Sequence, residues 1–190
     1  IKYIVKINEI LSIPAIYVSH SISETFILAN CVHFFKNGTL IYSGNRDEAI
    51  NFYNKNENFI FRDSYIKGKV IKANLQEGLT EIKLGKDSLT VFSNTLHLDQ
   101  NVIVKIKATD IIISTTIRDK LSSLNYLKTN IEEVVFEKGL VCLILNYEKN
   151  IIKALLTKKS YNKLKIKKGM YCYAIIKALN INDVFNINLD

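Results

Sequence analysis

One histidine stands where a side chain could do chemistry. His20 ends the stretch "IPAIYVSH", whose apolar residues predict a buried strand over Ala15–Ser19. Open α/β folds bind their ligands at the carboxyl ends of such strands. An imidazole titrates near neutral pH and can donate or accept a hydrogen bond there. Spacing alone leaves two readings open, a catalytic or ligand-sensing group and a solvated imidazole that ends a strand.

Composition limits the classes of partner. The 190 residues are 48% hydrophobic, enough for one sizeable core or two small ones. The net charge of +8 permits a nucleic-acid or anionic-membrane partner. The lysines are spread without a dense basic run, so charge alone is weak evidence for either. Cys31, Cys142 and Cys172 have neither pairing parity nor zinc-ligand spacing, which favours apolar fillers in a reducing compartment and predicts no metal site.

Residues 1–57 alternate helix and strand, which predicts part of an α/β layered domain. Ser21 with Glu24 three positions later is a capping-box spacing, and the Asn-Gly pair at 37 and 38 is a strong hairpin signal. Asn45 is the expected cap of another helix. The expected elements are helices over 1–11, after Ser21 and after Asn45, and strands Ala15–Ser19, Cys31–Phe35 and Thr39–Ser43.

From residue 58 onward, short apolar segments alternate with polar turns, which predicts an all-β domain. This half repeats itself: "EGLTEIKL" at 77–84 parallels "KGLVCLIL" at 138–145, and "IKATDI" at 106–111 parallels "IKALNI" at 176–181. Two such repeats in the same order favour a duplication. We expect two barrels of the oligonucleotide/oligosaccharide-binding type, in lobes 58–118 and 122–190. The second copy is longer by Thr157–Gly169, which is typical of a short helix before a turn.

The stretch "IPAIYVSHSISETFILANCVHFFKNGTLIYSG" resembles the region around the switch histidine of ABC-transporter ATPase subunits. Ser19-His20, Glu24, Ala29-Asn30, Gly38 and Gly44 occupy the family's positions, while Asn30-Cys31 replaces the usual Asp-Arg. The second half is similar to the accessory domain of the molybdate-importer ATPase subunit, with its TOBE/Mop module. The resemblance implies that residues 1–57 are the C-terminal part of a P-loop ATPase domain and 58–190 an accessory β domain.

In that family the histidine contacts the γ-phosphate of ATP, so the resemblance makes His20 the catalytic candidate. It also implies ATP and Mg²⁺ as cofactors of a longer parent, a permease and a second ATPase subunit as partners, and a place on the cytoplasmic face of the inner membrane. The sequence contains no G-x-x-x-x-G-K-[ST] loop. The chain by itself is therefore expected to need no cofactor and not to hydrolyse ATP.

The resemblance also implies an oxyanion site for molybdate or tungstate. The family's Ser-x-Arg-Asn motif and strand lysine fall on Ser122, Ser123, Asn125 and Lys177, and Leu124 stands in place of the arginine. Backbone N–H groups, hydroxyls and a lysine suit a tetrahedral oxyanion without a metal. A mere linker between two barrels is the competing interpretation. The competing function is a nucleic-acid-binding barrel protein, which is disfavoured because the aromatic residues sit among apolar ones, so no nucleic-acid partner is expected.

Overall fold

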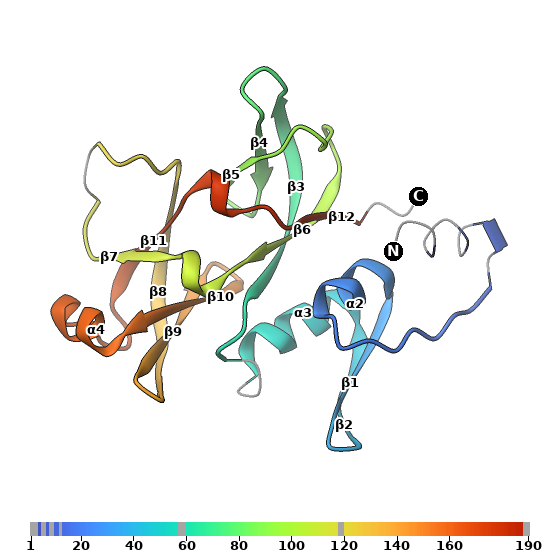
Figure 1. Cartoon of the computed structure of the whole chain (residues 1–190), viewed down its shortest axis with the longest axis horizontal. Coiled ribbons are helices and arrows are strands. Elements are labelled where there is room, and N and C mark those ends of the chain that lie inside the picture. Colours follow the sequence, from blue (N-terminus) through green and yellow to red (C-terminus); the bar gives the residue numbers. More distant parts are fainter. Residues whose placement is uncertain are drawn as a thin grey trace.

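The fold is mostly β with a few helices, as seen in a computed structural model that describes residues 4, 7, 10, 11, 13–56, 60–117 and 120–187 (Figure 1). The α-helices are α2 (Ile22–Leu28), α3 (Arg46–Lys55) and α4 (Lys158–Leu164), with 3-10 turns η2 (Ala108–Asp110) and η3 (Ala178–Asn180). The strands are β1 (Cys31–Lys36), β2 (Thr39–Asn45), β3 (Ser64–Asn74), β4 (Leu79–Lys83), β5 (Ser88–Phe92), β6 (Asn101–Ile106), β7 (Ile112–Ser114), β8 (Asn125–Glu137), β9 (Leu140–Tyr147), β10 (Asn150–Thr157), β11 (Tyr171–Ile176) and β12 (Val184–Asn186). No helix among these residues combines the length and apolarity needed to cross a membrane.

The predicted caps and hairpin of the first part are confirmed. The Ser21 side chain accepts a hydrogen bond from the Glu24 N–H at the start of α2, and Asn45 accepts one from the Glu48 N–H at the start of α3. The β1–β2 turn has positive φ at Asn37 and Gly38, as a two-residue hairpin turn requires. The predicted helix over 1–11 lies largely outside the described residues, of which 4, 7, 10 and 11 are helical.

The predicted strand Ala15–Ser19 is wrong for this chain. Residues 13–19 make no strand pairing, and the side chains of Ile16 and Val18 are 97% and 89% exposed. Extended apolar residues become a strand only when a neighbouring strand supplies main-chain partners. Within the described residues β1 and β2 pair only with each other, and neither pairs with this segment.

The two halves of the β domain exchange their closing strands. One five-stranded sheet has the order β5-β4-β3-β6-β12 and the other β10-β9-β8-β11-β7. The short strand β7 follows β3, β4, β5 and β6 along the chain but pairs with β11, and β12 follows β11 but pairs with β6. The predicted duplication is confirmed by these identical orders. The division into lobes 58–118 and 122–190 stays a prediction, and each predicted lobe gives its last strand to the other sheet.

The strand register aligns the two halves residue by residue. Ser64 pairs with Ile106, and Asn125 pairs with Ile176. Six residues later each first strand has a bulge, after Val70 and after Ile131. Beyond the bulges Thr90 of β5 and Lys153 of β10 occupy equivalent places. The β8–β9 hairpin is longer than the β3–β4 hairpin. As a result, the residues that the repeat "EGLTEIKL"/"KGLVCLIL" aligns in sequence differ by two positions from those that are equivalent in the sheets. A shift of two residues keeps the same side chains on the buried face.

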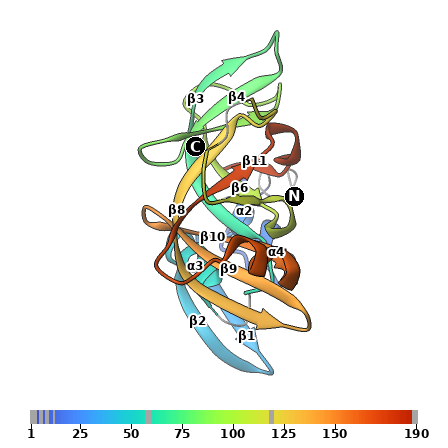
Figure 2. The same ribbon diagram turned by 90° about the vertical axis from the view of Figure 1, so that its left-hand side faces the viewer.

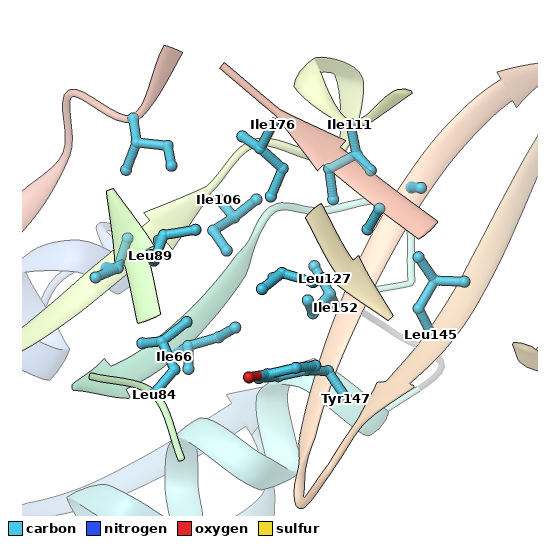
Figure 3. Packing of buried hydrophobic residues seen from close by; sticks show 14 of the residues in the cluster. Ile66, Leu84, Leu89, Ile106, Ile111, Leu127, Leu145, Tyr147, Ile152 and Ile176 are labelled. Atoms are coloured by element: carbon cyan, nitrogen blue, oxygen red, sulfur yellow. The ribbon is translucent and has the colours of Figure 1, made fainter. Parts of the chain in front are cut away.

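A single apolar core lies between the two sheets (Figure 3). It includes Ile66, Leu89 and Ile106 from one sheet and Leu127, Leu145, Ile152 and Ile176 from the other, all 1% exposed or less. Both sheets therefore depend on the same buried apolar surface. Removing that surface from water stabilises the fold by about 25 cal/mol per Å².

An aromatic cluster joins the first part of the chain to the β domain. Phe26 of α2 and Tyr53 of α3 meet Tyr65 of β3 edge to face, with ring centroids 5.1 and 5.6 Å from Tyr65. Buried Asn54 adds a polar contact: its amide donates to the Tyr65 carbonyl at 2.6 Å and its side-chain oxygen accepts from the Tyr65 N–H at 3.1 Å. The helix α3 is thereby fixed against strand β3.

Lys153 is a fully buried lysine at the junction of α3 and the sheets. Its ammonium lies 4.8 Å from the centre of the Tyr53 ring. Burial lowers the pKa of Lys153 to about 8, because a desolvated ammonium is less stable than a neutral amine. An unfolded lysine has a pKa of 10.5. Between these values the unfolded chain binds more protons, so Lys153 makes stability rise with pH.

Lys153→Met should remove this pH dependence. The gain in the free energy of unfolding relative to the wild type should be larger at pH 7 than at pH 10, by about 2 kcal/mol. Urea denaturation at both pH values measures it, and Lys149→Met, in an exposed turn, is the control. An equal effect of Lys153→Met at pH 7 and pH 10 would contradict the assignment.

Candidate functional site

His20 lies in a bend directly before the N-cap of α2, and its side chain is exposed. Its flanks are fixed by Glu24 of the first helical turn. The Glu24 carboxylate accepts hydrogen bonds from the Tyr17 hydroxyl at 2.8 Å and the Ser19 hydroxyl at 2.9 Å. The Ser21 N–H in turn donates to the Ser19 hydroxyl at 3.0 Å. The polypeptide on both sides of His20 is therefore held to α2.

Glu24 holds these flanks as a carboxylate. The hydrogen bonds from Tyr17 and then Ser19 lower the pKa of Glu24, because they stabilise its charged form. The same contact raises the pKa of Tyr17. The Ser21–Glu24 spacing predicted a capping box, but only its first half forms: the Glu24 side chain binds Tyr17 and Ser19 instead of the cap N–H. The sequence did not predict that Glu24 holds the His20 segment to α2 through these hydrogen bonds.

The oxyanion candidates lie at the beginning of β8 and the end of β11, and the structure brings them together. Buried Ser123 donates to the Ile176 carbonyl at 2.8 Å, and buried Asn125 donates to the same carbonyl at 3.0 Å. Lys177 follows Ile176 directly and precedes η3, with its side chain exposed. The Ile176 carbonyl thus ties the Ser122–Asn125 segment to the backbone that carries Lys177.

Asn125 also fastens the other sheet to this segment. Its side-chain oxygen accepts from the Thr90 N–H at 2.7 Å, and its amide donates to the Thr90 carbonyl at 2.8 Å. Both amide hydrogens of Asn125 and the hydroxyl hydrogen of Ser123 are therefore used within the chain. The exposed groups left to meet a ligand are the Ser122 hydroxyl and the Lys177 ammonium. Strand β5 was absent from the sequence-predicted site because its contact with residue 125 is long-range.

Leu124 borders a hollow of about 220 Å³ and is 57% exposed. The hollow is lined also by the following residues of the first sheet and its β3–β4 turn: Lys72, Asn74, Glu77, Leu79, Glu81 and Thr90. Glu81 lies 3.4 Å from the Lys72 ammonium. Two carboxylates and one ammonium line the wall, so the hollow carries more negative than positive charge and is a poor anion pocket by itself.

His20 and the oxyanion candidates lie in different parts of the molecule. Figure 1 shows α2, which follows His20, on the side opposite to β8 and β11. Among the described residues, no three His, Cys, Asp or Glu side chains group as metal ligands. The two candidates are therefore separate. One is an exposed imidazole on a segment held to α2, and the other is an exposed hydroxyl at Ser122 with an exposed ammonium at Lys177.

The chain is similar in sequence to known proteins. No protein-family model matches the chain. It is 26% identical over 180 residues to the molybdenum import ATP-binding protein ModC of Rhizobium johnstonii, covering 94% of this chain and 51% of that protein. It is 25% identical over 186 residues to the protein of the same name from Escherichia coli K12, covering 95% and 52%. The chain thus spans about half the length of these curated relatives.

A solved structure shares the fold. The molybdate-bound crystal structure of the cytoplasmic molybdate-binding protein ModG matches with a TM-score of 0.56 and 21% sequence identity. The match covers 65% of this chain and 95% of that one. At this identity the match establishes the fold.

Asn125→Ala should cost about 2–4 kcal/mol in the free energy of unfolding, because it removes two hydrogen bonds to the half-buried main chain of Thr90 and the buried one to the Ile176 carbonyl. Asn130→Ala is the matched control: the Asn130 amide makes one exposed hydrogen bond, to the Gly169 carbonyl at 3.0 Å, and its loss should cost below about 1 kcal/mol. Urea denaturation measures both. Equal costs would show that Asn125 does not fasten the sheets.

Proposed function

We propose that this chain, a relative of the molybdenum import ATP-binding proteins, is the C-terminal part of the ATP-binding subunit of an ABC importer for molybdate or a related oxyanion. The observation that carries the proposal is the extent of the likeness. Relatives of that name match 94–95% of the chain, across both the His20 segment and the β domain. In this proposal a longer parent couples ATP hydrolysis to transport.

Residues 1–57 are, in this proposal, the end of the parent's α/β ATPase domain. The exposure of Ile16 and Val18 supports it, since an extended apolar segment of this kind fits between strands of a larger sheet. His20 would be the histidine at the γ-phosphate, presented by the Tyr17–Ser19–Glu24 contacts. The chain has no phosphate-binding loop, so its residues do not form a nucleotide site by themselves. ATP and Mg²⁺ would bind in the parent.

The remaining partners follow from the same proposal. A permease subunit and a second ATPase subunit would complete the importer, with the parent peripheral to the cytoplasmic face of the membrane. The β domain would bind the oxyanion or brace the dimer of ATPase subunits.

The oxyanion site is proposed at Ser122, Ser123, Asn125 and Lys177. The contacts above divide their roles. The Ser122 hydroxyl and Lys177 ammonium would meet the anion, since they are exposed, whereas Ser123 and Asn125 would position the segment through the Ile176 carbonyl. A tetrahedral dianion suits a hydroxyl and an ammonium at one strand end. Leu124 supplies no charge, so weak binding is expected.

Molybdate or tungstate at millimolar concentration should raise the thermal midpoint of the chain, because a ligand of the native state stabilises it. Leu124→Arg should bring the same shift at about tenfold to a hundredfold lower oxyanion concentration, since a charged hydrogen bond contributes about 1.5–3 kcal/mol. Thermal denaturation with fluorescence detection measures the midpoint. Lys177→Ala should abolish the shift.

Lys107→Ala is the control, because Lys107 precedes η2 in the first half as Lys177 precedes η3 in the second. It should leave the molybdate shift intact. Sulfate and phosphate at the same concentration separate recognition from an ionic-strength effect. If neither the wild type nor Leu124→Arg responds to molybdate beyond these controls, the β domain is a brace and not a sensor.

A further inference from the structure

The positive charge of this chain is concentrated in one segment of the sequence that contains lysines but no carboxylates. Residues 149–182 contain nine lysines and no aspartate or glutamate. Six of the nine lie within residues 158–168, separated by serine, tyrosine, asparagine, leucine and isoleucine. The segment comprises β10, α4, β11 and η3. Its charge is therefore gathered on one part of the fold.

Six of these lysines form one exposed surface, which we term the α4 lysine patch. It lies on α4 and the turn after it, at the left-hand end of the molecule in Figure 1 and toward the viewer in Figure 2. Its members are Lys158, Lys159, Lys163, Lys165, Lys167 and Lys168.

The patch has no internal counter-charge in the described part of the chain. Three exposed lysines outside the patch do have such a partner: Lys67 pairs with Asp47 at 2.6 Å, Lys69 with Asp99 at 2.7 Å, and Lys72 with Glu81 at 3.4 Å. No ion pair joins a patch lysine to a carboxylate among the described residues, although β8, next to α4, ends at Glu137. Six like charges at close spacing repel one another, and an external polyanion would relieve that repulsion.

The backbone under the patch is firmly held. Thr157 caps α4 by accepting from the Ser160 N–H at 3.1 Å. Tyr161 packs edge to face on Phe136 of β8, with ring centroids 5.2 Å apart. Leu164 and Ile166 pack into the common core. The lysines thus project from a fixed platform, which keeps their charges together.

We propose that the α4 lysine patch docks on the anionic headgroups of a phospholipid membrane. Clusters of four to eight lysines on one surface bind such headgroups, each contributing a factor of about five in affinity. Single-stranded nucleic acid would need free aromatic faces for stacking. Here Tyr161 packs on Phe136, and Tyr171 lies under the Lys128 ammonium at 5.3 Å. The patch also holds no arginine, the residue suited to bidentate phosphate recognition. Docking of the patch on a membrane does not require that the β domain bind an oxyanion.

Co-sedimentation with vesicles of phosphatidylglycerol and phosphatidylcholine tests the docking. The chain should bind these vesicles and not vesicles of phosphatidylcholine alone. Binding should weaken as salt is raised, because the Debye length falls to about 3 Å at 1 M. The triple variant Lys158→Gln, Lys159→Gln, Lys163→Gln should bind about 100-fold more weakly. Circular dichroism checks that the exposed substitutions leave the fold unchanged.

The matched control is the triple variant Lys67→Gln, Lys69→Gln, Lys72→Gln, which removes the same charge from paired lysines. It should keep at least a third of the wild-type affinity. Equal loss in both variants would mean unspecific attraction by net charge and would overturn the proposal. No binding to anionic vesicles would overturn it too. So would a single-stranded oligonucleotide that binds the wild type more tightly than the vesicles and loses this affinity in the α4 variant, because the patch would then serve nucleic acid.

Discussion

The exchange of closing strands is the constraint on which the β domain depends. Each sheet has its last strand only because the other half of the chain supplies it: β7 completes the sheet of β11, and β12 completes the sheet of β6. Neither half can satisfy the edge of its own sheet in this arrangement. The exchange also draws η2 and η3 against the opposite sheets, where η2 contacts β10 and η3 contacts β5. The backbone that carries Lys177 is thereby placed beside Thr90.

Short polar side chains also connect the sheets and α3 to neighbouring strands by hydrogen bonds to the main chain. Asn125 binds both main-chain groups of Thr90, and Asn54 binds both main-chain groups of Tyr65. In each case an amide side chain acts as a substitute peptide group beside a strand. At the place equivalent to Asn125, the hydroxyl of Ser64 accepts from the Lys153 N–H at 2.9 Å. The duplication therefore extends to the side chains that hydrogen-bond one sheet to the other. Asn125 makes two such bonds to the Thr90 main chain, whereas Ser64 makes one to the Lys153 N–H.

Much of the fold could be predicted from the sequence because its signals are local. The caps at Ser21 and Asn45 and the Asn37-Gly38 turn act within four residues, and the structure confirms them. The strand exchange could not be predicted, because three-residue strands such as β7 carry no preference for one partner over another. The failure at Ala15–Ser19 has the same origin, since a strand needs a neighbour that local sequence does not specify. At the oxyanion candidate, the family resemblance implied that Ser123 and Asn125 are ligands, whereas their buried hydrogen bonds go to the main chain of Ile176 and Thr90.

The two sheets form one cooperative unit, and native-state hydrogen exchange tests this most directly. Amides of β3 and β6 and amides of β8 and β11 should exchange through global unfolding with the same free energy in both sheets, and that value should match the one from urea denaturation. The common core and the exchanged strands leave no boundary at which one sheet could open alone. Two distinct free energies, one for each sheet, would contradict the account, because they would show that the halves unfold separately despite the exchange.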